Sequence, residues 1–333
     1  MLRRKLRQED YHVAWISPVS NLEMLPSRLM LDEEHDAPDY DTSYDENVYV
    51  YGTMAGHNVV IATCPPGLTG NVNAGHVTGA MFKTFSSIRM AVLVGIGGGV
   101  PQAIHSEDPT QNLHLGDVVV GWPADGGDAC VAYDAGRWHT DGLFEIRGTI
   151  NRPDRVLLNG LGKLALDHDM DMSSFHEHRD RLINSKHKRK FAFPGLDKDQ
   201  LYQASYKHTG VYGNRCAHCD PSKVVDRPKR TEEDVQRLTF HQGRIASGNA
   251  VVQDGEYRDE IGRRCNGALC IEMEAAGVDA SRAALVIRGI SDYSDSHKGD
   301  AWRSYAAGNA AIFARELLSK IPPATVRKMD LQG

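Results

Sequence analysis

An arginine and several acidic residues lie within or beside segments that are otherwise apolar. The run Ala284–Ile290 carries Arg288 and is followed two residues later by Asp292, while Glu272 and Glu274 open a second segment of small and apolar residues. Turns explain serine and aspartate, because both side chains bond their own backbone, but they do not explain a buried arginine, which is costly unless paired. We therefore expect a polar cavity, with Arg288 paired to a carboxylate, holding a nucleophile, or serving as a purely structural ion pair.

The elements that must position these groups alternate between strands and helices. Apolar runs predict strands at the following positions: His12–Ile16, Asn58–Cys64, Met90–Val94, Asp117–Gly121, Arg244–Ala246 with Val251–Val252, and Ala284–Ile290. Helical spacing predicts helices at Leu25–Leu31, Ala74–Thr84, Met273–Ala284 and Ser304–Lys320. This alternation favours an α/β domain with a largely parallel sheet. Ligands of such domains bind beyond the carboxyl ends of strands, where Asp292 falls.

The bulk composition is that of a globular protein. The chain has 333 residues, of which 41% are hydrophobic and 25% charged, and its formal net charge is -6. This charge gives no reason to expect nucleic-acid or membrane binding, and no window reaches the ~18–20 consecutive apolar residues of a membrane span. No apolar secretory segment follows the N-terminus. The six dispersed cysteines favour a reduced, cytoplasmic protein.

Residues 168–242 differ from the rest of the chain. They hold seven of the fifteen histidines. They also hold the basic run Lys186–Lys190, which is typical of a solvated loop, a nuclear signal or a patch for an acidic partner. The region lacks the regular apolar periodicity of an independent core. We therefore interpret it as an insertion over the sheet, within a single domain spanning residues 1–333.

The insertion also contains the sequence Cys216-Ala-His-Cys219. Two cysteines at this spacing invite a zinc interpretation, with His208 and His241 as candidates for further ligands. A structural zinc ion normally needs four ligands, and only one close pair is visible. We therefore predict no metal, and a loop whose thiols pack or stay free.

A glycine run, Val94–Pro101, directly follows one predicted strand. Glycines permit tight turns, and backbone N–H groups exposed there can face an anion or a sugar. Gly97 and Gly98 are therefore candidates for binding substrate. The run matches neither the dinucleotide-binding fingerprint nor the P-loop, so a tight turn without a ligand remains the alternative.

Six segments together resemble the nucleoside phosphorylase/nucleosidase superfamily, and most closely its fungal purine-nucleoside-phosphorylase-like domain, found alone or at the N-terminus of NACHT-type proteins. The segments carrying the resemblance are Ala14–Ile16, Leu31–His35, Val94–Gly99, Leu115–Val120, Ile271–Gly277 and Val286–Lys298. The resemblance extends over about residues 11–321. It implies a single α/β/α domain with a central twisted mixed sheet, assembled as a homo-oligomer. It also implies cleavage of a nucleoside N-glycosidic bond without metal or organic cofactor.

The resemblance gives roles to the residues of the two polar segments. Asp292 matches the general acid that protonates the leaving purine, and Ser291 would orient it; capping a turn is the alternative for Asp292. Glu274 matches the glutamate that binds the ribose hydroxyls and stabilises positive charge on the sugar. Met273 would pack against sugar and base, or be an ordinary core methionine. Glu272 supports the site or contacts the ligand.

Four residues are expected to close the purine pocket, namely Gly248, Asn249, Val251 and Val252. Related nucleosidases stack an aromatic residue on the base where this chain has Val251, which weakens any expectation of selectivity for 6-aminopurines. Tyr293 and Trp302 are the candidates to replace that aromatic residue.

The superfamily divides between phosphate and water as the nucleophile. The resemblance places Glu23 where nucleosidases keep the base that activates water, and Ile96 where phosphorylases keep a phosphate-binding serine. A carboxylate repels phosphate, so we predict hydrolysis, with Asp292 and Glu23 on opposite sugar faces, ~6.5–9.5 Å apart.

The sequence therefore predicts a purine nucleoside hydrolase. One alternative is a phosphorylase that binds phosphate through Arg227, Arg230 or Arg244 of the insertion and its flank. The other is a module that binds nucleosides without cleaving them. The sequence does not show which purine is preferred, whether the substrate is a nucleoside or a nucleotide, or how many chains form the oligomer.

Overall fold

The computed structural model describes residues 3–122, 126–210 and 216–329. Its strands are β1 (Arg4–Lys5), β2 (Val13–Ile16), β3 (Glu33–Asp36), β4 (Val50–Met54), β5 (His57–Ala62), β6 (Met90–Gly99), β7 (Val118–Gly121), β8 (Cys130–Trp138), β9 (Phe144–Thr149), β10 (Phe240–Gly243), β11 (Ile245–Ser247), β12 (Cys270–Glu272) and β13 (Leu285–Asp292). Its α-helices are α1 (Met24–Leu29), α2 (Asn71–Thr84), α3 (Arg155–Asp169), α4 (Phe175–Ile183), α5 (Gly255–Arg264), α6 (Ala275–Asp279), α7 (Arg303–Ser319) and α8 (Pro323–Arg327). No helix of these ranges is long and apolar enough to cross a membrane.

The strands form one mixed sheet that forks at β6. Along one side of β6 the strands follow the order β2, β5, β4, β3 and β1. β2 runs parallel to both β6 and β5, whereas β4 runs antiparallel to β5. The carboxyl end of β6 pairs antiparallel with β12, which leads to β11, β8 and β9. β13 runs parallel to β6 and continues the sheet to β7 and β10. The predicted α/β class is confirmed, and the central position of β13 places its carboxyl end in the middle of the sheet.

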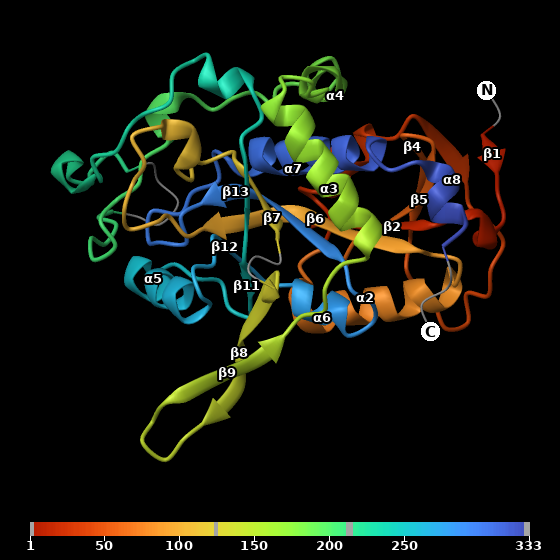
Figure 1. The fold of residues 1–333 in the computed structure, drawn as a ribbon, viewed down its shortest axis with the longest axis horizontal. Helices are drawn as coiled ribbons and strands as arrows, with labels where there is room; N and C mark the ends of the chain where they lie inside the picture. Colours follow the sequence, from red (N-terminus) through yellow and green to blue (C-terminus); the bar gives the residue numbers. More distant parts are fainter. Residues whose placement is uncertain (1–2, 123–125, 211–215, 330–333) are drawn as a thin grey trace.

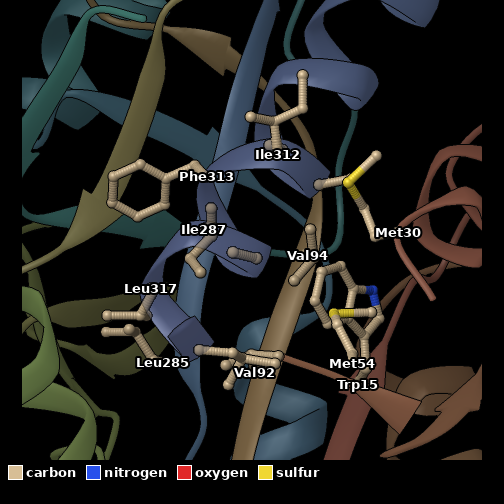
Figure 2. Packing of buried hydrophobic residues seen from close by; sticks show 14 of the residues in the cluster. Trp15, Met30, Met54, Val92, Val94, Leu285, Ile287, Ile312, Phe313 and Leu317 are labelled. Carbon is tan, nitrogen blue, oxygen red and sulfur yellow. The ribbon is translucent and has the colours of Figure 1, made fainter. Parts of the chain in front are cut away.

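The two faces of the sheet bury alternate residues of the same strands. On one face Trp15, Val92 and Ile287 pack against α7 through residues such as Phe313 (Figure 2). On the other face, neighbouring strand residues such as Leu93 pack against α2 and α6. Figure 1 shows α7 on one side of the sheet and α2 with α6 on the other. Both faces are therefore covered, which explains why the central strands read as continuous apolar runs.

The glycine run is part of a strand, so the alternative of a tight strand-to-helix turn was wrong. Residues Gly95–Gly99 continue β6 and pair with β13 and β12. A Cβ atom at Gly97 would collide with Cys270 Sγ, and one at Gly98 with Ser294 Oγ. The glycines let the three strands approach closely at the fork.

Other elements also differ from the prediction. Val251–Val252 is not a strand, and α6 covers only part of the predicted helix Met273–Ala284. The β8–β9 hairpin, which projects from the body of the molecule (Figure 1), was not predicted. Its outer half is exposed, so it lacks the apolar alternation that marks a strand in sequence.

Candidate active site

Arg288 is the centre of a buried cluster of charges. It lies in β13, is fully buried, and donates hydrogen bonds to Glu272 and, at 3.2 Å, to Glu274 Oε2. These carboxylates raise the pKa of the guanidinium above its ordinary value, against the effect of burial. The predicted pairing of Arg288 with a carboxylate is therefore what the structure shows, with two partners rather than one.

Glu272 and Glu274 lie on either side of the β12–α6 junction. Glu272 accepts hydrogen bonds from the backbone N–H groups of Glu274, at 2.9 Å, and Ala275, at 3.0 Å, so it satisfies the first turn of α6. Glu274 Oε1 accepts one from the N–H of Gly70, 3.1 Å away and directly before α2. Burial, together with the neighbouring Glu272, raises the pKa of Glu274. Glu272 thus serves the backbone and Arg288, while Met273 between them is half-buried.

Glu23 enters the same cluster from the opposite end of the chain. It lies directly before α1 and is buried, and its two carboxylate oxygens accept backbone hydrogen bonds from Ile96, at 2.8 Å, and Val19, at 2.7 Å. Burial raises the pKa of Glu23 to about 7, although Arg288 and these two N–H groups oppose the shift. A carboxylate with a pKa near neutrality can accept a proton from water at physiological pH.

Asp292 ends β13 directly after an irregularity in the strand. The register with β6 shifts between Ile290 and Asp292, which re-aims the aspartate. Its Oδ2 lies 2.7 Å from Ser291 Oγ and 2.8 Å from Lys298 Nζ, and its Oδ1 accepts from the N–H of Ser294 at 3.0 Å. Ser291 therefore contacts Asp292 as predicted. Lys298 was not assigned any chemistry from the sequence, because its contact with Asp292 becomes visible only in the structure.

A cavity of about 660 Å³ opens beside Asp292. Its walls come from the end of β13, the following loop and the insertion, and include Ser291, Asp292, Tyr293, Lys298, Trp302, Lys198, Tyr202, His208 and Cys216. Part of residues 168–242 therefore lies beside the carboxyl end of β13. The Tyr293 hydroxyl bonds Asp199 and Arg227, so this aromatic ring is tied to the insertion.

The residues predicted to close the purine pocket do not line the cavity beside Asp292. Asn249 is exposed, and it joins Asp134 of β8, at 2.8 Å, to the first N–H of α2, at 3.3 Å. The side chain of Val251 is 57% exposed, whereas Val252 is buried. Contact of Asn249, Val251, Gly97 or Gly98 with a substrate stays a prediction.

Replacing Gly95 by alanine is expected to disturb the charge cluster. A Cβ atom at Gly95 would collide with Glu23 Oε1 and Arg288 Nη1, which bond the backbone N–H and the carbonyl of Ile96, respectively. We expect the free energy of unfolding to fall by about 1–3 kcal/mol, measured by urea denaturation, because overpacking a buried site forces its neighbours to shift. Gly162→Ala on the exposed face of α3 is the matched control, since a Cβ atom there meets nothing within 4 Å. Equal stability of both variants would contradict the packing described above.

Two solved structures are similar to this chain along nearly its whole length. The 5′-methylthioadenosine/S-adenosylhomocysteine nucleosidase of Neisseria meningitidis, in complex with methylthio-immucillin-A, gives a TM-score of 0.56 and 18% identity over 92% of this chain and 98% of that one. The futalosine hydrolase of Helicobacter pylori gives a TM-score of 0.53 and 17% identity over 93% and 97%. This chain has the nucleoside phosphorylase/nucleosidase fold. The fold that the resemblance implies is thereby confirmed.

The sequence relatives of this chain are much longer than the chain itself. A nucleotide-binding leucine-rich repeat (NLR)-like protein of Hyaloscypha variabilis is 32% identical over 325 residues, which is 98% of this chain and 31% of that protein. The ATP nucleosidase Cap17 of Escherichia coli is 40% identical over 79 residues, covering 22% of this chain and 16% of that protein. The chain thus spans less than a third of the length of these relatives. No family model matches it.

Proposed function

We propose that this chain is a purine nucleoside hydrolase, which cleaves the N-glycosidic bond with water and releases the free base and ribose. The observation that carries the proposal is the cluster of Glu23, Glu272 and Glu274 around Arg288. The guanidinium is already shared among carboxylates, so the cluster offers little positive charge to a phosphate dianion. A buried carboxylate such as Glu23 suits a water molecule instead.

The proposed mechanism divides the work between the two ends of the site. Asp292 donates a proton to the leaving base, held in place by Ser291 and by the ammonium of Lys298. Glu274 accepts hydrogen bonds from the ribose hydroxyls and stabilises the positive charge that develops on the sugar. Glu23 takes a proton from the attacking water. Arg288 orients Glu274.

The contacts of the rival phosphate-binding arginines also support hydrolysis. Arg230 pairs with Asp117, and both side chains are buried. Arg227 bonds the carbonyl of Leu113, at 2.7 Å, as well as Asp199 and Tyr293. Arg244 bonds two backbone carbonyls. Each is thus engaged with protein groups, and a phosphorylase would have to free at least one of them.

The test is the release of free base, followed by chromatography, from inosine, guanosine, adenosine and ATP. ATP is included because a relative is named an ATP nucleosidase. We expect equal release in phosphate-free and phosphate-containing buffer, with an unphosphorylated C1 on the sugar product. Release that needs phosphate and yields a sugar 1-phosphate would establish the phosphorylase instead. Binding of these ligands without any base release would establish a sensing module.

The rate of hydrolysis is expected to fall as the pH drops below about 7. The pKa of Glu23 is raised to about 7, so the carboxylate that accepts a proton is lost on the acidic side of that value. Well below it, kcat/KM should fall by about tenfold per pH unit. Because the folded state favours the neutral form of Glu23, the protein is more stable when this carboxyl is protonated. That contribution to the free energy of unfolding is lost as the pH rises through about 7.

Glu23→Gln is expected to remove this acid limb and to lower kcat at every pH. The exposed Glu256, in the first turn of α5, provides the matched control Glu256→Gln, which should keep the full profile. An unchanged acid limb in Glu23→Gln would rule out Glu23 as the base. Thermal melts of both variants separate this result from unfolding, because a glutamine must turn its amide against one of the two N–H donors.

A further inference from the structure

Three metal-binding side chains, His208, Cys219 and His297, meet beside the cavity next to Asp292, and Cys216 lies close to His208. Cys216, Cys219 and His208 come from the insertion, and His297 comes from the loop after β13. His208 Nδ1 lies 3.2 Å from Cys219 Sγ and 3.8 Å from Cys216 Sγ. One ligand atom each of His208, Cys219 and His297 lies within 4.8 Å of the other two. The cluster therefore joins two segments about 80 residues apart in sequence.

The imidazole of His297 is buried without hydrogen bonds. Its side chain is 4% exposed, and neither of its ring nitrogens has a hydrogen-bond partner among the described residues. The nearest charged group is Asp295 Oδ1, 3.7 Å from Nδ1. A buried polar group without a partner is costly, so these nitrogens indicate a ligand that binds them.

The distances match those of a tetrahedral zinc site. Zinc binds sulfur at about 2.3 Å and nitrogen at about 2.0–2.1 Å, which places neighbouring nitrogen and sulfur ligands about 3.5 Å apart. The two distances from His208 Nδ1 lie on either side of this value. Two cysteines separated by two residues are the usual spacing of a structural zinc pair. The structure thus keeps His208, a candidate ligand from the sequence, and adds His297, which was not a candidate.

We propose that Cys216, Cys219, His208 and His297 bind a structural zinc ion that fastens the insertion to the loop behind Asp292. His297 replaces His241, the other candidate considered from the sequence, because His241 bonds Asp117 at 2.8 Å. This proposal departs from the prediction that the chain binds no metal.

Neighbouring contacts already hold the proposed ligands in place. The His297 ring stacks on Tyr202, with centroids 3.9 Å apart, and its backbone N–H donates to Asp295 Oδ1 at 2.9 Å. The backbone N–H of His208 donates to Ser296 Oγ at 2.9 Å, one residue before His297. Lys298, which contacts Asp292, directly follows the proposed ligand. The ion would therefore fix both the cavity wall and the ammonium beside the proposed general acid.

The first test measures metal content. The full chain is purified without chelator, incubated with zinc chloride and dialysed. Elemental mass spectrometry is then expected to find about one zinc ion per chain. Cys216→Ser, Cys219→Ser and His297→Ala should each lose most of it. The controls His218→Ala, an exposed residue between the two cysteines, and Cys265→Ala, a buried cysteine of another cluster, should keep it.

Cobalt substitution tests the geometry. The cobalt-loaded chain should show the strong visible absorption of a tetrahedral cobalt–thiolate site, and Cys216→Ser should lose it. A chain that retains no zinc or cobalt would overturn the proposal. Thiol titration of the denatured chain then identifies what replaces it, since six free thiols mean a plain loop and four mean a Cys216–Cys219 disulfide.

A thermal melt separates a structural ion from one bound adventitiously. A strong chelator should lower the Tm of the wild-type chain and leave the Tm of the Cys216→Ser/Cys219→Ser variant unchanged. An equal response of both proteins would overturn the structural role. None of these measurements depends on the proposed hydrolase activity.

Discussion

Replacing Arg288 by methionine is expected to lower the free energy of unfolding by about 3–5 kcal/mol, the usual consequence of removing one partner from a buried ion pair. Methionine preserves most of the apolar stem but leaves Glu272 and Glu274 buried without their cation. Glu23 loses the nearby charge that opposes the rise in its pKa. Urea denaturation at pH 8 measures the loss.

The dependence of this loss on pH identifies its origin. At pH 5.5 Glu23, whose pKa is about 7, is mostly protonated, and the raised pKa of Glu274 acts in the same direction. The difference between variant and wild type should therefore shrink as the pH falls. The control is Arg244→Met, a half-buried arginine that bonds backbone carbonyls and not carboxylates. A difference that is the same at both pH values would mean that lost packing, and not charge, destabilises Arg288→Met.

Replacing Asp292 by asparagine is expected to lower kcat by about 10²–10⁴-fold, the range of a lost general acid. Asparagine keeps the shape of the side chain and can still accept from the N–H of Ser294, so the fold and ligand binding should persist. Single-turnover base release measures the chemistry separately from product release.

Asp300→Asn provides the matched control for Asp292→Asn. Asp300 lines the same cavity but pairs with Arg303 and is exposed, so its replacement should leave the rate within twofold or so. If Asp292→Asn retained full activity, another group would have to protonate the base. If both variants lost activity equally, the effect would come from the charge of the cavity as a whole.

The sequence allowed the charged core of the site to be predicted because its signal is local. Arg288 within an apolar run, and Glu272 and Glu274 beside a short helix, contradict ordinary burial preferences, and such conflicts concentrate at functional sites. The structure places these residues in contact. Glu23 was assigned only through the family resemblance, because nothing around it distinguishes it from a surface glutamate. Its burial depends on β6, more than seventy residues away.

The parts of the site that escaped prediction depend on contacts between distant segments. The glycine run of β6 looks like a turn, since the crowding by Cys270 and Ser294 that excludes side chains there is visible only in the sheet. His297 lies near His208 and Cys219 of the insertion, which are distant from it in sequence. Lys298 contacts Asp292, whose direction depends on the irregularity in β13. The β8–β9 hairpin carries little apolar alternation, so its pairing is not evident from periodicity.

The central position of β13 has a consequence for synthesis on the ribosome. β13 is the last strand of the sheet to be made, yet it pairs with both β6 and β7 and supplies the guanidinium that Glu272 and Glu274 contact. Until residues 285–292 have emerged, one edge of β6 is unpaired and the acidic residues lack their cation. The nascent chain therefore cannot complete its core segment by segment, and the earlier strands must wait, exposed to chaperones, until residues 285–292 have been made.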